Sequence, residues 1–383
     1  MRLTDMFFNN SALFKRKNLI TVCFDFQTGI IKLTTEANGK HVEEECPCLL
    51  NSYSDEFYKT LVADILNFAK NNEINKIRVN VVFPETAVVT DYVEVPVIAG
   101  KNIKNTLEIS LCGLYKNRKD LFIKTFCAFK NKNSNTYFVS GIKAERVMKL
   151  KAACAAAKIG VNTCVVSSEA TIRAFRDLRK DSKKGYIFAD VKKNSTKLIF
   201  VYNGNAVCGA TIPFGVSLLE SENVVNVNDA IRHTAAETAV LKAYINALSN
   251  EIAYDNGLDE NSDKEELYYD KAAKKIRRKQ AESLVAATAD EQDVFATNLK
   301  TFAEWIYRYI DDNEKIVSLI NPSFIYVNVD KEYEFIIDKL NENYKESIFF
   351  CSAQLNNLDE KIVSDLSCYG GSLFNNDNGF NVF

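Results

Sequence analysis

The chain has 383 residues, with 48 lysines and arginines against 50 aspartates and glutamates and a formal net charge of −2. This near-neutral balance excludes a general electrostatic attraction to nucleic acid or to a membrane surface. No apolar run approaches the ~20 residues that cross a bilayer, and the N-terminus lacks a signal-peptide pattern. We therefore expect a cytoplasmic protein that is long enough for two domains.

In the first half of the chain, alternating apolar residues predict strands, and apolar residues at helical spacing predict the helices between them. Ser54 and the pair Ser167-Ser168 precede two of these helical patterns and are typical N-caps. The predicted strands are a meander at 18–50 with a turn at Asn38-Gly39, then 76–83, 86–98, 121–130, 135–142 and 161–167. The predicted helices are 54–72, 102–115, 145–157 and 167–178. The segment from 86 to 142 forms a small βαββ unit inside the first domain.

The second half begins with another array of strands from Tyr186, in which Asn203-Gly204 marks a hairpin turn. Beyond Pro213 the pattern becomes helical, and the chain closes with alternating strands and helices. The predicted helices are 227–248, 264–287 and 292–310, then one through Phe335 and Leu340 and a last one ending at Gly370-Gly371. The predicted strands in the closing part are 323–329 and 347–351.

The chain contains ten cysteines, most of which lie inside apolar patterns, where a thiol packs as a small apolar side chain. These are Cys23, Cys112, Cys127, Cys154, Cys164, Cys208 and Cys351. We expect them to fill the core in a reducing compartment. Cys46 and Cys48 form a close pair near His41, so the alternative there is a weak metal site, although His233 is the only other histidine.

Two segments read as copies of one β-hairpin. Each has an apolar strand that ends in an aspartate, Asp25 or Asp190, followed by a short polar turn and a returning strand. A tight turn can point its backbone N–H groups at a phosphate, and a carboxylate can hold a hydrated cation. Two such hairpins are therefore suited to clasp one phosphorylated ligand between two half-domains.

The order of these parts resembles the actin-like ATPase superfamily and, within it, the PilM/FtsA-like family, of which the type IV pilus assembly proteins PilM are the nearer branch. The family's first hairpin reads roughly Asp-Ile-Gly-Ser-Ser-Ser-Ile-Lys, and here the residues run from Asp25 to Lys32. The second reads roughly Asp-Ile-Gly-Ala-Ser-Ser-Thr, and here they run from Asp190 to Thr196. Further matches are Phe83-Pro84, Val95-Pro96, the passage from Leu150 to Val161, Tyr369 to Leu373 and the ending Asn381-Val382-Phe383.

The resemblance implies an α/β protein with two duplicated ribonuclease H-like domains. The first domain would cover residues 1–182, with the βαββ insert at about 79–142. The second would cover 183–383, with a helical subdomain at about 226–314. It also implies that ATP and Mg²⁺ are the ligands of the two hairpins. The residues that match the family's nucleotide contacts are Asp25, Gln27, Thr28, Gly29, Lys32, Asp190, Lys192, Lys193, Ser195 and Thr196.

The departures from the family pattern fall on these nucleotide contacts. Gln27 and Lys192 stand where the family has glycine, and no glycine occurs near 328–330, where the family has a Gly-Gly pair. Glycine permits positive φ and close ligand approach, whereas another residue costs about 1–2 kcal/mol and blocks the approach. Three losses of about 2 kcal/mol each would weaken a micromolar ligand about ten-thousandfold. We therefore expect a degenerate nucleotide site with no cofactor.

Two alternatives stay open for the residues that remain. Lys192 and Lys193 carry charge that could hold a phosphate where N–H groups are lost, which would leave weak binding of ATP with Mg²⁺. Otherwise the retained Asp and Ser side chains only bond their own turns. No general base is evident near the phosphate position, so no catalytic residue is predicted, although a weak ATPase stays possible.

By resemblance to PilM, we expect a scaffold at the cytoplasmic face of the cell membrane that binds the tail of a membrane-anchored, PilN-like pilus or secretion component. Association with the membrane would then be indirect, and no nucleic acid is involved. In the family the tail binds by the insert, whose exposed strands could pair with an extended peptide. The alternative is an FtsA-like, ATP-binding filament former or membrane-associated cell-division protein. The C-terminal sequence argues against this alternative, because it has no amphipathic helix that could lie on a bilayer. A sugar or acetate kinase of the same superfamily is a third class. The sequence leaves the oligomeric state open.

Overall fold

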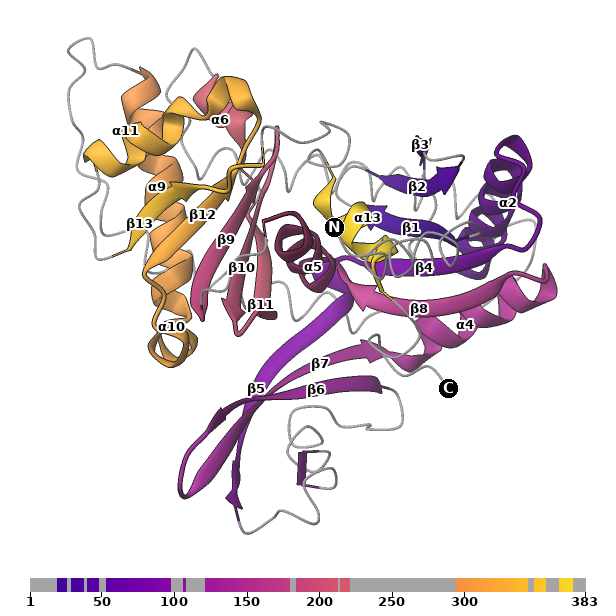
Figure 1. Cartoon of the computed structure of the whole chain (residues 1–383), viewed down its shortest axis with the longest axis horizontal. Helices are drawn as coiled ribbons and strands as arrows, with labels where there is room; N and C mark the ends of the chain where they lie inside the picture. Colours follow the sequence, from indigo (N-terminus) through magenta and orange to yellow (C-terminus); the bar gives the residue numbers. More distant parts are fainter. Residues whose placement is uncertain are drawn as a thin grey trace, which may run out of the picture. The chain divides into compact units, whose positions relative to one another are not determined.

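The structure is a computed structural model that describes eleven stretches of the chain (Figure 1). The described residues are 19–25, 29–37, 40–47, 53–97, 106–107, 121–179, 184–212, 214–220, 294–343, 348–355 and 365–374. The helices predicted at 227–248 and 264–287, and nearly all of that at 102–115, lie outside these residues. Within the described ranges, no helix is long and apolar enough to cross a membrane.

The first five-stranded sheet has the order β3-β2-β1-β4-β8. Strands β1 (Leu19–Asp25), β2 (Ile30–Ala37) and β3 (Lys40–Pro47) form the predicted antiparallel meander. Strand β4 (Arg78–Phe83) pairs in parallel with both β1 and β8 (Gly160–Val166). Two helices, α2 (Asp55–Asn71) and α4 (Ala144–Ala156), bury their apolar positions in the same core as one face of this sheet. Ser54 caps α2 as predicted, because its hydroxyl accepts from the Phe57 N–H at 3.1 Å.

The insert contains a three-stranded antiparallel sheet of order β5-β7-β6. Its strands are β5 (Val88–Pro96), which follows the short 3-10 helix η1 (Glu85–Ala87), β6 (Leu121–Lys130) and β7 (Ser134–Lys143). Strand β4 overlaps the start of the predicted insert, about 79–142, and pairs within the first sheet. The reason is physical: β4 is buried on both faces, as is typical of a central parallel strand, and the insert begins only after Pro84.

The second five-stranded sheet repeats the first, with the order β11-β10-β9-β12-β13. Its strands are β9 (Gly185–Val191), β10 (Thr196–Tyr202), β11 (Asn205–Ile212), β12 (Phe324–Asn328) and β13 (Phe349–Ser352). Strands β9, β10 and β11 are antiparallel, and β12 joins β9 in parallel, as β4 joins β1. Asn203 and Gly204 adopt φ of 50° and 72°, so the predicted hairpin turn is confirmed.

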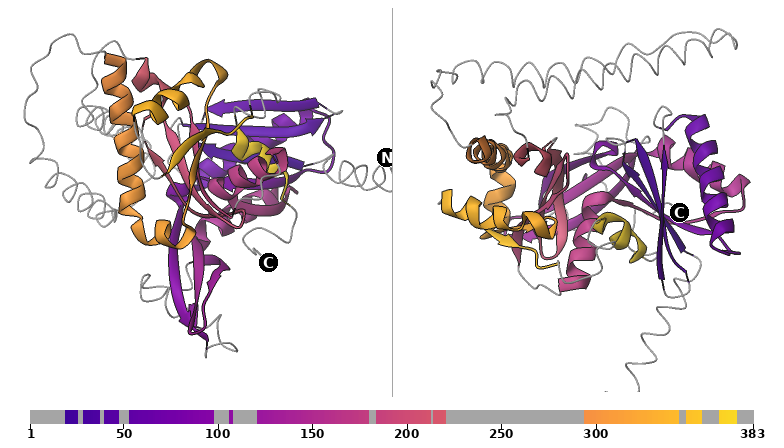
Figure 2. Two further views of the ribbon diagram at one scale, coloured as in Figure 1. Left: turned by 60° about the vertical axis from the view of Figure 1, so that its left-hand side comes forward. Right: turned by 90° about the horizontal axis from the view of Figure 1, so that it is seen from above.

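Helices accompany the second sheet. They are α6 (Val216–Leu219), α9 (Val294–Asp312), α10 (Glu314–Ile320) and α11 (Phe335–Asn343), with the short 3-10 helix η4 (Lys331–Tyr333). Helix α9 runs alongside the sheet (Figure 2), where its Tyr309 ring lies 5.6 Å from Phe200 of β10. The chain divides into a compact unit of residues 1–218 and 302–383 and a second unit, Leu219–Thr301. Of the second unit, the structure describes Leu219, Glu220 and the start of α9.

Two short helices, α5 (Ser167–Arg179) and α13 (Leu366–Ser372), pack closely on each other. A Cβ at Gly370 would lie 1.7 Å from the Ala170 carbonyl oxygen, so only glycine permits this approach. Helix α13 shares a buried cluster with Cys23 of β1 and Val82 of β4. Helix α13 therefore packs on the first sheet, although its residues fall within the range predicted for the second domain, 183–383.

Candidate functional site

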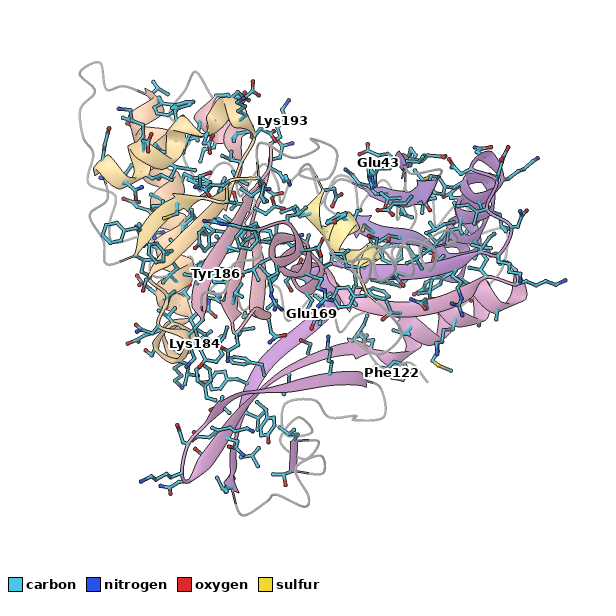
Figure 3. All side chains as sticks on the ribbon, viewed as in Figure 1. Glu43, Phe122, Glu169, Lys184, Tyr186 and Lys193 are labelled. Atoms are coloured by element: carbon cyan, nitrogen blue, oxygen red, sulfur yellow. The ribbon has the colours of Figure 1, made fainter. Side chains whose placement is uncertain are left out.

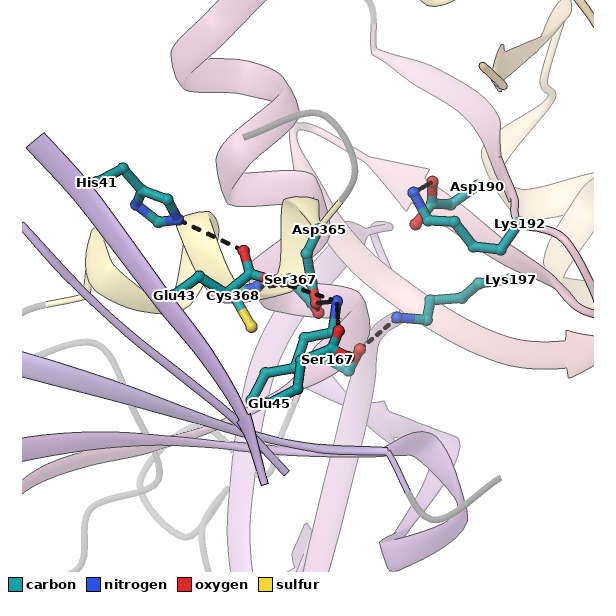
Figure 4. Close-up of polar contacts among 11 residues, drawn as sticks. His41, Glu43, Glu45, Ser167, Asp190, Lys192, Lys197, Asp365, Ser367 and Cys368 are labelled. Carbon is teal, nitrogen blue, oxygen red and sulfur yellow. Dashed lines mark hydrogen bonds and ion pairs between the residues drawn. The ribbon is translucent and has the colours of Figure 1, made fainter. Parts of the chain in front are cut away.

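The second hairpin holds its aspartate in a closed set of contacts. Asp190 is the second-last residue of β9, it is only 4% exposed, and its Oδ1 accepts from Asn328 Nδ2 at 2.7 Å. Asn328 ends β12 and lies opposite Asp190 in the parallel ladder. The Lys192 ammonium lies 3.0 Å from the same Oδ1 (Figure 4). A buried carboxylate is thus neutralised by a lysine two residues further along its own turn.

The backbone of this turn is also engaged. The Lys192 N–H donates to the Ser195 carbonyl at 2.8 Å, which closes the turn. The Lys192 and Lys193 carbonyls accept from the N–H groups of Val216 and Ser217 at 3.0 and 2.9 Å. A Cβ at Gly215 would lie 1.9 Å from the Lys192 oxygen, so the approach of this segment needs a glycine.

Two further residues of the predicted set complete this hairpin. Thr196 is fully buried and donates its hydroxyl to the Phe214 carbonyl at 2.7 Å. Ser195 is half-buried, and the exposed Lys193 lies at the tip of the turn (Figure 3). Asp190, Lys192, Ser195 and Thr196, four of the candidate residues, therefore lie around one turn.

The first hairpin is described at its two strands. Asp25 ends β1 opposite Ile30 of β2, and Gly29 adopts φ of 67°, a conformation that favours glycine. The candidate residues Gln27 and Thr28 lie outside the described residues. The hairpin therefore keeps one glycine where its returning strand begins, whereas the turn of the second hairpin has none.

Lys32, the candidate lysine of β2, lies within a cluster of carboxylates. Its Nζ lies 3.0 Å from Glu45, 3.5 Å from Glu43 and 3.3 Å from Asp365. Burial opposes the charge on Lys32, but the carboxylates, Asp365 foremost, outweigh it and raise the lysine pKa above its usual range. One ammonium thus serves three carboxylates that come from β3 and from the start of α13.

Asp365 also caps α13. Its carboxylate accepts from the Cys368 N–H at 3.1 Å and from the Ser367 hydroxyl at 2.7 Å. Burial alone would raise the pKa of Asp365, yet Lys32, these two hydrogen bonds and the more distant Lys192 lower it below its usual range. Sequence reasoning missed this residue, although Asp before Leu-Ser-Cys is a recognisable N-cap signal. It also missed Asn328 as a partner of Asp190, because the sequence pattern at that position indicates only that the family's glycine is absent.

The cysteines lie largely in the core. Burial raises the pKa of the Cys154 and Cys164 thiols to about 11 and about 12. Cys46 is buried too, and burial, with Asp64 and Glu44 nearby, raises its pKa to about 11. The described residues contain no group of three His, Cys, Asp or Glu that could hold a metal ion. Cys48 and His233, two residues of the alternative metal prediction, lie outside them.

Neither a family model nor a curated protein sequence matches this chain. Solved structures do. A structure described as the PilM-PilN type IV pilus biogenesis complex is similar over 94% of this chain and 98% of that one, at 12% identity and a TM-score of 0.55. This chain has the actin-like ATPase fold.

Two more distant structures are also similar. The cytoplasmic domain of EpsL, an inner membrane component of the type II secretion system of Vibrio cholerae, covers 55% of this chain and 77% of its own, at 13% identity and a TM-score of 0.37. A Bacteroides thetaiotaomicron protein with an actin-like ATPase fold and unknown function covers 92% and 97%, at 9% identity and a TM-score of 0.38. The similarity at a TM-score of 0.55 confirms the actin-like fold predicted from the sequence, and at 12% identity it shows no more than the fold.

Proposed function

We propose that this protein is a docking scaffold of a type IV pilus or related secretion machine, and that it binds the cytoplasmic tail of a membrane-anchored component. The observation that carries the proposal is the Lys192–Asp190 ion pair. In this hairpin the carboxylate that could hold a ligand's cation is paired with a lysine of its own turn instead. The similarity to a structure named for a PilM-PilN complex supports the choice of apparatus and of partner.

The nucleotide site is degenerate in this proposal. A hydrated Mg²⁺ at Asp190 would compete with an ammonium at 3.0 Å and with the Asn328 amide, which already occupy one carboxylate oxygen. Lys32, the lysine that would meet a phosphate, serves three carboxylates instead. The described residues therefore do not fit ATP with Mg²⁺ unless both ion-pair sets are broken, which would leave the buried Asp190 carboxylate without its cation.

The tail would bind at the insert. The order β5-β7-β6 makes β5 and β6 the edge strands of a small sheet, and an edge strand presents backbone groups to an extended peptide. Val97, directly after β5, is 45% exposed, although its N–H already donates to Asn133. This end of the insert sheet thus offers an exposed apolar side chain beside an edge strand.

In-cell photo-crosslinking tests the proposal. A photoreactive residue at Val97 should crosslink to the N-terminal, cytoplasmic segment of a protein with one membrane-spanning helix, identified by mass spectrometry of the crosslinked peptide. Met148 is the matched control, because it is a similarly exposed apolar residue (56%) on α4, outside the insert sheet. Equal crosslinking from Val97 and Met148, or products formed only with soluble proteins, would contradict the proposed docking function.

A further inference from the structure

Strand β10 contacts the insert directly at one end, and near its other end it contacts α5, which is itself paired with the insert. It starts at Thr196, directly after the turn that carries Lys192, and it ends at Tyr202. At its far end, the Phe129 ring of β6 lies 4.2 Å from the Tyr202 ring. Since a β-strand inside an antiparallel ladder is stiff, a displacement imposed at one end reaches the other.

The second connection runs through the first turn of α5. Lys124 of β6 pairs with Glu169 of α5 at 2.8 Å, and the Glu169 side chain is only 13% exposed. Glu169 lies where α5 meets the insert (Figure 3). Two residues earlier, Ser167 accepts a hydrogen bond from the Lys197 ammonium of β10 (Figure 4).

Lys197 links this helical turn to the candidate site. In the antiparallel ladder Lys197 lies opposite Asp190, the buried carboxylate that holds Lys192. Side chains directly opposite each other in such a ladder lie on the same face of the sheet. The path from the insert to the hairpin therefore begins with the Lys124–Glu169 pair and continues along the first turn of α5 to Ser167. From there it runs through the hydrogen bond to Lys197, and Lys197 lies opposite Asp190 in the ladder.

We propose that the insert and the second hairpin are coupled through β10, so that a change at β6 alters the order of the turn at 192–195. This inference deepens the proposed function, on which its biological meaning rests. A tail bound at the insert would alter the turn at 192–195, in the degenerate nucleotide site, without any nucleotide. The coupling itself is a property of the chain alone, and its physical warrant is the pair of contacts at the two ends of one strand.

Hydrogen exchange of the full-length protein tests the coupling without a ligand. The variant Lys124→Met should raise the exchange rates of backbone amides between 187 and 201 about fivefold, the factor that ~1 kcal/mol of local stability corresponds to. Glu169→Gln should produce the same increase. Exchange in the double variant should be little faster than in either single variant, because both substitutions remove the same Lys124–Glu169 ion pair.

The matched control is Lys149→Met, which removes a lysine that pairs with Asp55 and Glu145 at 3.0 and 3.1 Å in the first domain. It should leave exchange in the hairpin unchanged. Phe129→Leu gives a second route, since it weakens the contact at Tyr202, together with the ring contact to Phe138 of β7, and should also raise exchange in the hairpin. If Lys124→Met, Glu169→Gln and Phe129→Leu change exchange only within β6, β7 and α5, the coupling is refuted, whatever the crosslinking experiment shows.

Discussion

The two hairpins have the same topology but place their lysines differently. In the second, Lys192 pairs with the aspartate of its own turn, so the ion pair is local. In the first, Lys32 reaches Asp365 at the start of α13, a residue from the far end of the chain. The difference shows that the lysine of such a hairpin can be held in two ways: by a carboxylate of its own turn, or by carboxylates that tertiary packing brings from distant segments. The predictions below disturb first the second hairpin and then the first.

The largest loss of stability is expected from a substitution at Gly215, which packs against the turn of the second hairpin. Gly215→Ala places a Cβ 1.9 Å from the Lys192 carbonyl oxygen, so the turn must move, at a cost of about 3 kcal/mol. Urea denaturation measures the loss. Gly160→Ala is the control, because its Cβ would meet nothing closer than 3.7 Å. Equal stability of the two variants would mean that the turn does not depend on this packing.

A smaller loss should follow from removing the ion pair of the second hairpin. Lys192→Met leaves Asp190 buried without its cation and should lower the free energy of unfolding by about 2 kcal/mol. Adding Asp190→Asn to the same protein should restore part of the loss, since the uncompensated charge is then gone. Lys193→Met, at the exposed neighbouring position, should leave the urea midpoint unchanged. A Lys193 effect as large as that of Lys192 would argue against a specific pair.

The first hairpin should show the smallest effect and a distinctive pH dependence. Asp365→Asn keeps an N-cap acceptor but removes the charge near Lys32, so stability at pH 7 should fall by about 1 kcal/mol. The folded pKa of Asp365 is lowered, so its contribution is fully present above about pH 4 and is lost as the pH falls through the folded pKa. The free energies of unfolding of Asp365→Asn and of the wild type should therefore converge as the pH falls below the folded pKa of Asp365.

Asp55→Asn is the control for this pH series. Asp55 also pairs with a lysine, Lys149 at 3.0 Å, but its side chain is 76% exposed. An exposed pair contributes little, so this variant should follow the wild-type stability at every pH. If Asp55→Asn and Asp365→Asn behave alike, the Lys32 cluster has no special role.

Much of this architecture follows from local sequence signals. Apolar alternation located the strands, Ser54 located the start of α2, and Asn203-Gly204 located the turn between β10 and β11. The duplicated aspartates pointed to the repeated hairpins, and the similarity in structure confirms the fold they imply. These features depend on residues within a few positions of one another, which is why one sequence reveals them.

The parts that escaped prediction depend on contacts between distant segments. Nothing near Gly370 indicates that α13 returns to the first sheet, because the contact that requires this glycine is the carbonyl of Ala170. The pairing of Lys32 with Asp365 likewise joins two ends of the chain. The Lys192–Asp190 pair is local, yet the sequence left open whether Lys192 would face a phosphate or its own carboxylate, because a side-chain direction in an irregular turn is set by tertiary packing.

Calorimetric titration of ATP with Mg²⁺, into the wild type and into a variant with both Gln27→Gly and Lys192→Gly, tests the central claim most directly. We expect no heat of binding to the wild type at ATP concentrations up to several millimolar, because a micromolar Kd weakened about ten-thousandfold lies above this range. The double variant, which regains two family glycines and frees Asp190, should bind measurably more tightly. Wild-type binding at or below about 0.1 mM, with stabilisation of about 2.7 kcal/mol at one hundred times Kd, would contradict the claim of a degenerate site.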